Sequence, residues 1–130
     1  MKYIYSALFE VEPDKVYARV PDLPGCITTG KNLEDAIDQI TDAASIWLVS
    51  AEDDGEEIPA ATAQDSMERK GGQQYSLIQI DTLAYRAKID TRAVRKNVSL
   101  PAWMATLADQ RGINCSQVLQ NALKEQLQEV

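Results

Sequence analysis

The chain has 130 residues, which allows one ordinary domain or one compact domain with a small appendage. Apolar residues make up 45% and charged residues 25%, which argues against a disordered chain, and no apolar run approaches the roughly 20 residues of a membrane span. The formal charge is −7; residues 1–90 carry 8 Lys or Arg against 17 Asp or Glu, whereas residues 91–130 carry 5 against 3. An acidic body joined to a locally basic end indicates two partners of different charge.

The cysteines and the absence of histidine bear on metal and redox chemistry. Cys26 and Cys115 lie in different segments, and the first ten residues lack the apolar core of a secretory signal. We therefore expect reduced, buried or half-buried thiols in a cytosolic protein. Zinc needs about four close ligands, and a chain without His or a CxxC pair does not supply them. The sequence predicts no metal and no cofactor.

The first thirty residues predict three strands. Residues 2–12 and 15–20 are rich in Tyr, Ile, Phe and Val, and a turn at Pro13 separates them. In the second run, Val16, Ala18 and Val20 alternate with more polar positions, as in a strand with one buried face. The segment 21–25 (PDLPG) then forces a tight turn, and residues 26–28 can form a short third strand.

A long amphipathic helix is predicted to follow. Asn32 is a suitable N-cap, and Asp35 lies three residues on, where a carboxylate favours a helix N-terminus. Eight apolar residues then recur at helical spacing, namely Leu33, Ala36, Ile37, Ile40, Ala44, Trp47, Leu48 and Ala51. The helix is expected to end near the acidic run 52–55, which lacks the regular ligand spacing of a calcium loop and is better explained as a solvated helix end.

The order of the remaining elements defines the body. We expect a short helix over residues 62–69, capped by Thr62, and a fourth strand over 75–80. Residues 1–81 are then a small α+β domain with its helix packed on a sheet. From 82 to 91 the periodicity fades and the charges turn basic, so this stretch is predicted to be a linker to a separate domain at 92–130.

The C-terminal forty residues predict one strand and two helices. Residues 94–100 alternate apolar and polar positions and stop at Pro101, which suits the first turn of a helix. Gly112 is placed to end that helix in the left-handed conformation, and Asn114 is placed to cap a second one. So small a module buries too little surface to be stable alone, and a lone strand leaves an unpaired edge. Antiparallel pairing with the same strand of a second copy satisfies both needs.

In such a dimer the two faces of the ribbon differ. We expect an apolar dimer core made by Val94, Val98, Leu100, Trp103, Leu107, Val118, Leu119 and Leu123. Arg95, Asn97 and Ser99 then project outward, where Arg can read guanine, Asn can read adenine and Ser can donate or accept. The start of the second helix, at Asn114, Cys115 and Ser116, offers free backbone N–H groups for a DNA phosphate. The plainer alternative is an ordinary edge strand with polar outward residues.

The run RKNVSLP, a helix, GINCS and a second helix together resemble the ribbon-helix-helix (MetJ/Arc) DNA-binding family. The resemblance implies that alternate strand residues read bases and that the second helix's N-terminus holds a phosphate. Lys96 departs from the family pattern, because it occupies an inward position that is more often apolar. Its ammonium is expected either to weaken the packing or to extend toward a phosphate.

The segment PDLPGCITTG followed by NLEDA resembles the signature of HicB antitoxins, and the resemblance extends over nearly the whole chain. It implies a partial RNase H-like body that binds and neutralises a HicA-type, mRNA-cleaving toxin. It also implies a C-terminal dimer that binds operator DNA and represses its own operon, which would place the protein at the nucleoid when it is bound there. The acidic charge of residues 1–90 supports this partner independently, since an RNA-binding toxin should have a basic surface.

Two other functions are compatible with parts of this sequence. A nuclease of the RNase H type needs several carboxylates around two metal ions. Glu10, Asp22 and Asp35 are candidates, but the last two have structural roles as turn and helix-start residues, so no enzymatic activity is expected. The second alternative is a stand-alone ribbon-helix-helix regulator whose N-terminal domain senses a small organic ligand.

Overall fold

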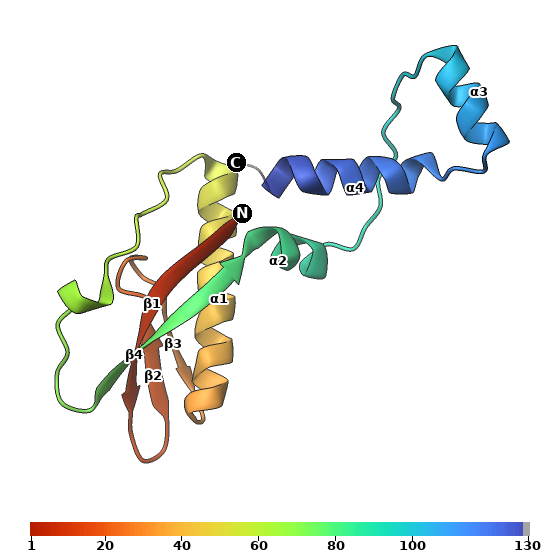
Figure 1. Cartoon of the computed structure of the whole chain (residues 1–130). Coiled ribbons are helices and arrows are strands. Elements are labelled where there is room, and N and C mark those ends of the chain that lie inside the picture. The colour runs from red at the N-terminus through yellow and green to blue at the C-terminus, as the bar shows by residue number, and fades with distance from the viewer. Residues whose placement is uncertain (129–130) are drawn as a thin grey trace.

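Strand β1 (Lys2–Val11) lies inside a four-stranded antiparallel sheet of order β3-β2-β1-β4. The computed structural model describes residues 1–128, so residues 129–130 of the predicted C-terminal domain lie outside the description. Figure 1 shows the sheet backed by one long helix, with the C-terminal helices extending away from this body. The other elements are β2 (Val16–Arg19), β3 (Ile27–Gly30), α1 (Leu33–Asp54), the 3-10 helix η1 (Gln64–Ser66), β4 (Gln73–Asp81), α2 (Thr82–Ile89), α3 (Ala102–Gln110) and α4 (Cys115–Gln128).

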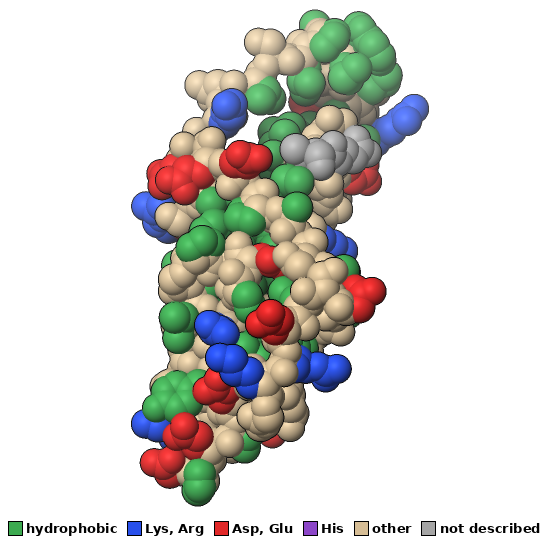
Figure 2. Space-filling model, turned by 90° about the vertical axis from the view of Figure 1, so that its left-hand side faces the viewer, with side chains coloured by type: hydrophobic (Ala, Val, Ile, Leu, Met, Phe, Trp, Pro, Cys, Tyr) green, Lys and Arg blue, Asp and Glu red, His purple; other side chains and the backbone are tan. Residues whose placement is uncertain are grey.

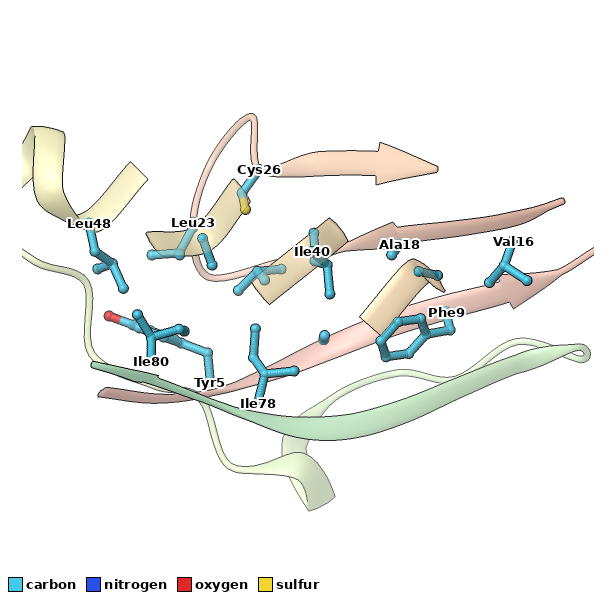
Figure 3. Packing of buried hydrophobic residues seen from close by; sticks show 14 residues of the cluster. Tyr5, Phe9, Val16, Ala18, Leu23, Cys26, Ile40, Leu48, Ile78 and Ile80 are labelled. Atoms are coloured by element: carbon cyan, nitrogen blue, oxygen red, sulfur yellow. The ribbon is translucent and has the colours of Figure 1, made fainter. Parts of the chain in front are cut away.

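The core lies between the sheet and α1. Alternate residues of β1 point toward the helix because successive side chains of a strand face opposite sides. Each large apolar side chain removed from water contributes about 1.5–3 kcal/mol to folding. Figure 3 shows these side chains converging on α1 from three strands. The buried cluster includes Tyr5, Ala7, Phe9, Val16, Ala18, Ile40, Ala44, Leu48, Ile78 and Ile80.

Helix α1 begins where its cap was predicted. The Asn32 Oδ1 atom accepts a hydrogen bond from the Asp35 N–H at 2.9 Å, and the Asp35 carboxylate accepts one from the Lys31 N–H at 2.9 Å. This reciprocal arrangement resembles a capping box. Gly30 lies just before it and packs so closely that a Cβ atom there would be 2.4 Å from the backbone nitrogen of Ala36. The glycine therefore allows β3 to approach the start of α1.

Two predicted elements differ from the structure. The expected helix over 62–69 is only the 3-10 turn η1, and Thr62 does not cap it, because its N–H and hydroxyl groups bond to Asp22 instead. The expected linker over 82–91 is helical over most of its length, since α2 occupies Thr82–Ile89. Asp81 Oδ1 accepts from the Ala84 N–H at 3.1 Å and so caps this helix. The apolar periodicity of α2 is weak, and polar contacts from Arg86 and Thr82 to Glu52 join it to α1.

The C-terminal helices follow the predicted order. Helix α3 starts directly after Pro101, and Gly112 adopts the left-handed φ of +64° just past its end. Residues 90–100 carry no regular secondary structure. A strand requires a neighbour to complete its hydrogen bonds, and the single chain offers none to this segment. The paired ribbon over 94–100 thus stays a prediction that concerns two copies.

Candidate functional site

The three carboxylates considered for nuclease chemistry have separate hydrogen-bonding partners. Glu10 accepts from the side-chain amide of Gln73, Asp35 belongs to the α1 cap, and Asp22 accepts from Thr62 at 2.6 and 2.8 Å. Within residues 1–128, no group of three or more His, Cys, Asp or Glu side chains is placed to hold a metal ion. Each carboxylate therefore has its own local structural partner.

A polar network joins α1 to α2 beside the first residues of β1. The Glu52 carboxylate accepts hydrogen bonds from the Tyr3 hydroxyl at 2.7 Å, the Thr82 hydroxyl at 3.1 Å and the Arg86 guanidinium at 3.2 Å. Arg86 also pairs with Asp53 at 2.8 Å. Thr82 is fully buried. The network fixes α2, and with it the direction in which the chain leaves the body.

The protonation of this network follows from its burial and its hydrogen bonds. Burial and the hydrogen bond to Glu52 raise the pKa of Tyr3 to about 12. Burial alone would raise the pKa of Glu52, but the hydrogen bonds from Tyr3, Arg86 and Thr82 outweigh it and lower that pKa below its usual value of 4.5. The stable form at neutral pH is therefore a carboxylate between a neutral phenol and a guanidinium.

An apolar cleft of about 430 Å³ lies in the C-terminal segment. Residues from the irregular stretch before Pro101, from α3 and from α4 all contribute to it. Figure 2 shows hydrophobic side chains gathered at the end of the molecule formed by the C-terminal helices, whereas charges of both signs are spread over the body. The lining residues are Lys96, Val98, Leu100, Met104, Ala108, Ile113, Cys115, Ser116, Val118, Leu119 and Ala122.

The predicted dimer-core residues are exposed in the single chain. Val94 is 88% exposed and Trp103 64%, and Ala108 is the sole buried residue of α3. Among residues 92–128 no other buried side chain is present. Because a stable module does not leave so many large apolar side chains in water, this surface needs a covering partner. The other exposed members of the predicted core are Val98, Leu100, Leu107, Val118, Leu119 and Leu123.

Every second residue between positions 95 and 100 lines the cleft. Lys96, Val98 and Leu100 line it. Arg95, Asn97 and Ser99 do not line it and are exposed. The cleft-lining residues and the three predicted base-reading residues thus occupy alternate positions, but all six are exposed in the single chain, and the base-reading role stays a prediction.

The start of α4 has the predicted cap. Asn114 Oδ1 accepts a hydrogen bond from the Gln117 N–H at 3.1 Å. The first turn of α4 contains no acidic residue, and Cys115 and Ser116 lie there beside Lys96 along the cleft. The N–H groups of a first helical turn have no partner within the helix, so this end of α4 is electropositive.

The five Lys and Arg residues between positions 86 and 96 fall into two groups in the structure. Arg86 is engaged by Glu52 and Asp53, and Arg92 forms a two-pronged pair with Asp90 at 2.9 and 3.0 Å. Lys88, Arg95 and Lys96 make no ion pair with the side chains that the structure describes. The sequence could not distinguish these two groups, because the carboxylates that bind Arg86 are more than thirty residues earlier.

The two thiols have different environments. Cys26 is buried at the end of the 21–25 turn, and burial raises its pKa. Cys115 is exposed at the start of α4, so the expectation of a buried or half-buried thiol is wrong for this residue in the single chain. It lines the cleft, and a partner seated there would cover it.

This architecture, a four-stranded antiparallel sheet with one covering helix and an appended pair of helices, defines a small α+β protein. A chain of the solved "Toxin-Antitoxin complex from Streptococcus pneumoniae" superposes with a TM-score of 0.62 at 18% identity, covering 97% of this chain and 99% of that one. The Burkholderia pseudomallei antitoxin HicB gives 0.50 at 22% identity, with 99% and 98% covered. The antitoxin HicB3 gives 0.51 at 21%, with 95% and 97% covered. At these identities the likeness concerns the fold.

The family is established by sequence. Residues 5–122 match the model of the family described as "HicB_like antitoxin of bacterial toxin-antitoxin system", and the chain belongs to that family. This confirms the resemblance drawn from the PDLPGC and NLEDA segments at the level of the family. No curated protein matches the chain. In the described part of the chain, no helix is both long and apolar enough to cross a membrane.

Proposed function

We propose that this protein is an antitoxin with two binding parts. The N-terminal body, with its predicted partial RNase H-like character, binds and neutralises a HicA-type, mRNA-cleaving toxin. The C-terminal segment dimerises as a ribbon-helix-helix module, binds operator DNA and represses the antitoxin's own operon. Both roles are binding functions, and neither requires catalysis, a metal or a cofactor in this chain.

Membership of the HicB-like antitoxin family carries the first part. Two of the similar solved structures are toxin–antitoxin complexes, one from Streptococcus pneumoniae and one of HicA3 with HicB3. Helix α1 has no Lys or Arg over its 22 positions and has seven acidic residues, of which Glu52 and Asp53 are paired with Arg86 and Asp35 caps the helix. Its other four acidic residues are exposed and form no ion pair with the described residues, namely Glu34, Asp38, Asp42 and Asp54. A helix so charged is complementary to the basic surface that an RNA-cleaving protein requires, and such complementarity raises both association rate and specificity.

The open apolar cleft supports the second part. A second copy that lays its own 94–100 strand against the first would complete the hydrogen bonds of both strands and cover both clefts. The exposed side chains of Arg95, Asn97 and Ser99 would then form one face of a two-stranded ribbon, the shape that enters the major groove. Lys96 and the electropositive start of α4 are suited to flanking phosphates.

Co-expression and gel-shift measurements test the two parts separately. The full-length chain should restore growth of cells that express the adjacent toxin gene and should co-purify with its product. It should also shift a DNA fragment from upstream of its own gene, with an affinity that falls steeply as salt rises. A toxin that fails to co-purify would refute the first part, and an unshifted operator fragment would refute the second.

A further inference from the structure

Strand β4 is an edge of the sheet that lacks the usual protection against pairing. Within the described residues it has one neighbour, β1, and the register runs unbroken from Lys2 opposite Asp81 to Glu10 opposite Gln73. Its nine residues are therefore fully paired on one side and open on the other, with no bulge. In Figure 3, β4 lies beyond β1 at one margin of the sheet, as its outermost place in the strand order requires.

The composition of β4 makes this edge unusual. Natural proteins blunt exposed edges with charged side chains, proline, bulges or very short strands. From Gln73 to Ile80 the strand has none of these, since it contains no Lys, Arg, Asp, Glu, Pro or Gly. The opposite edge, β3, has only four residues and so offers little template. The exposed part of β4 also includes Leu77, which is 62% exposed.

We propose that β4 pairs with β4 of a second copy of this chain, antiparallel and centred on Leu77, so that two bodies share one continuous eight-stranded sheet. A two-fold axis perpendicular to the sheet through this point pairs all nine residues of each strand. It brings the two Leu77 side chains together on the face away from α1, where the Cβ atoms of directly opposite residues lie about 4.5–5.5 Å apart. Both α1 helices stay on the same face of the joined sheet, so the core between sheet and helix in each body is undisturbed.

The strand is complementary to itself in charge. Centred on Leu77, Asp81 meets Gln73 of the second copy, and the remaining pairs join uncharged residues. Ser76 meets Ile78, and Tyr75 meets Gln79. No like charges oppose each other, whereas two Lys or two Glu directly across would be destabilising. A second copy therefore fits this edge without any change in sequence.

The interaction goes beyond the proposed ribbon, because it uses a different strand of a different domain. The two surfaces reinforce each other, since copies held together at one interface meet at the other with a raised effective concentration. Helix α2 begins directly after β4 and is tied to α1 through Arg86, so pairing at β4 would also fix where each ribbon leaves its body.

The test compares full-length variants by light scattering after gel filtration, without DNA or toxin. Val98→Asp places a charge in the predicted ribbon core and should leave a dimer held by β4. Adding Leu77→Lys places two ammonium groups across the axis, and the mass should halve to that of a monomer. The matched control is Val98→Asp with Ile27→Lys, which puts the same charge on a residue 64% exposed, on the same sheet face but at the β3 edge. This control should remain a dimer.

Two results would overturn the proposal. One is a monomeric Val98→Asp chain with the circular dichroism of the wild type, and the other is a Val98→Asp, Leu77→Lys chain that stays dimeric. Failure of the ribbon proposal has a different signature, because Leu77→Lys alone would then be monomeric rather than dimeric. Hydrogen exchange gives a second readout: β4 amides should be protected in Val98→Asp and should exchange faster once Leu77→Lys is added.

Discussion

The carboxylate of Asp22 accepts two hydrogen bonds from Thr62, a residue 40 positions further along the chain, at 2.8 Å from its N–H and 2.6 Å from its hydroxyl. The same turn is bound elsewhere, since the Trp47 indole donates to the carbonyl of Pro24 at 2.9 Å. The PDLPG turn is thus an anchor for both α1 and the loop that follows it. Its residues serve the architecture, which agrees with the structural role predicted for Asp22.

Asp22→Ala should lower the free energy of unfolding by about 1–2 kcal/mol, because both hydrogen bonds of Thr62 are lost. Urea denaturation of the purified chain measures this change. Asp14→Ala is a suitable control, because that carboxylate lies in an exposed turn and forms no hydrogen bond or ion pair with the described residues. Equal stability of the two variants would show that the loop is held by other contacts.

Gly30→Ala should destabilise the body by roughly 1–3 kcal/mol, the usual cost of forcing extra volume into a packed site. The added Cβ atom would approach the backbone nitrogen of Ala36 to 2.4 Å, so either β3 or the start of α1 must shift. Gly71→Ala is the matched control, since nothing lies within 4 Å of a Cβ atom there. Thermal unfolding of both variants provides the comparison, and a tolerated Gly30→Ala would mean that β3 and α1 are less closely packed.

Arg86→Ala should release α2 from α1, because it removes the ion pairs with Glu52 and Asp53. Hydrogen exchange over residues 82–89 should accelerate, and the free energy of unfolding should fall by about 1 kcal/mol, given the partial exposure of these groups. Lys88→Ala removes an equal charge from the same helix but breaks no ion pair that the structure describes. If both variants exchange alike, the salt bridge does not hold α2.

Stability should depend on pH through Glu52. Its pKa is lowered in the folded protein, so its contribution is present above the unfolded value of about 4.5 and is lost as pH falls through the folded value. The wild type should therefore lose more stability than Glu52→Gln when pH is reduced from neutrality to below 4. Denaturation curves at a series of pH values measure the difference, and parallel losses would contradict the assigned role of the carboxylate.

Arg95→Ala should weaken operator binding by roughly 1–3 kcal/mol and relax sequence preference at one position of each half-site. Arg69→Ala is the control for charge, because it removes an exposed arginine from the body, away from the predicted ribbon. Affinities should be compared at one salt concentration, because contacts with DNA phosphates make the affinity of both variants depend on salt. Wild-type binding by Arg95→Ala would mean that the ribbon face does not read the bases.

The sequence by itself determined the elements whose signals are local. The Asn32 cap, the apolar stripe of α1, the strand alternation and the breaks at Pro101 and Gly112 all depend on residues within a few positions of each other. Their boundaries differ from the structure by only a few residues. The motif around PDLPGC also sufficed to predict the family that the whole-chain comparison confirms.

Only the tertiary structure decided what distant residues do together. Helix α2 has little apolar periodicity, and it is joined to α1 by contacts of Arg86 and Thr82 with Glu52, at least thirty positions earlier in the chain. The same contact pairs Arg86, one of the basic residues of the stretch 82–91, with carboxylates of the body. Likewise, the open edge of β4 exists because β1 pairs with both β2 and β4 and leaves β4 outermost. Such facts follow from which segments lie side by side, and that is set by the packing of the whole core rather than by any local pattern.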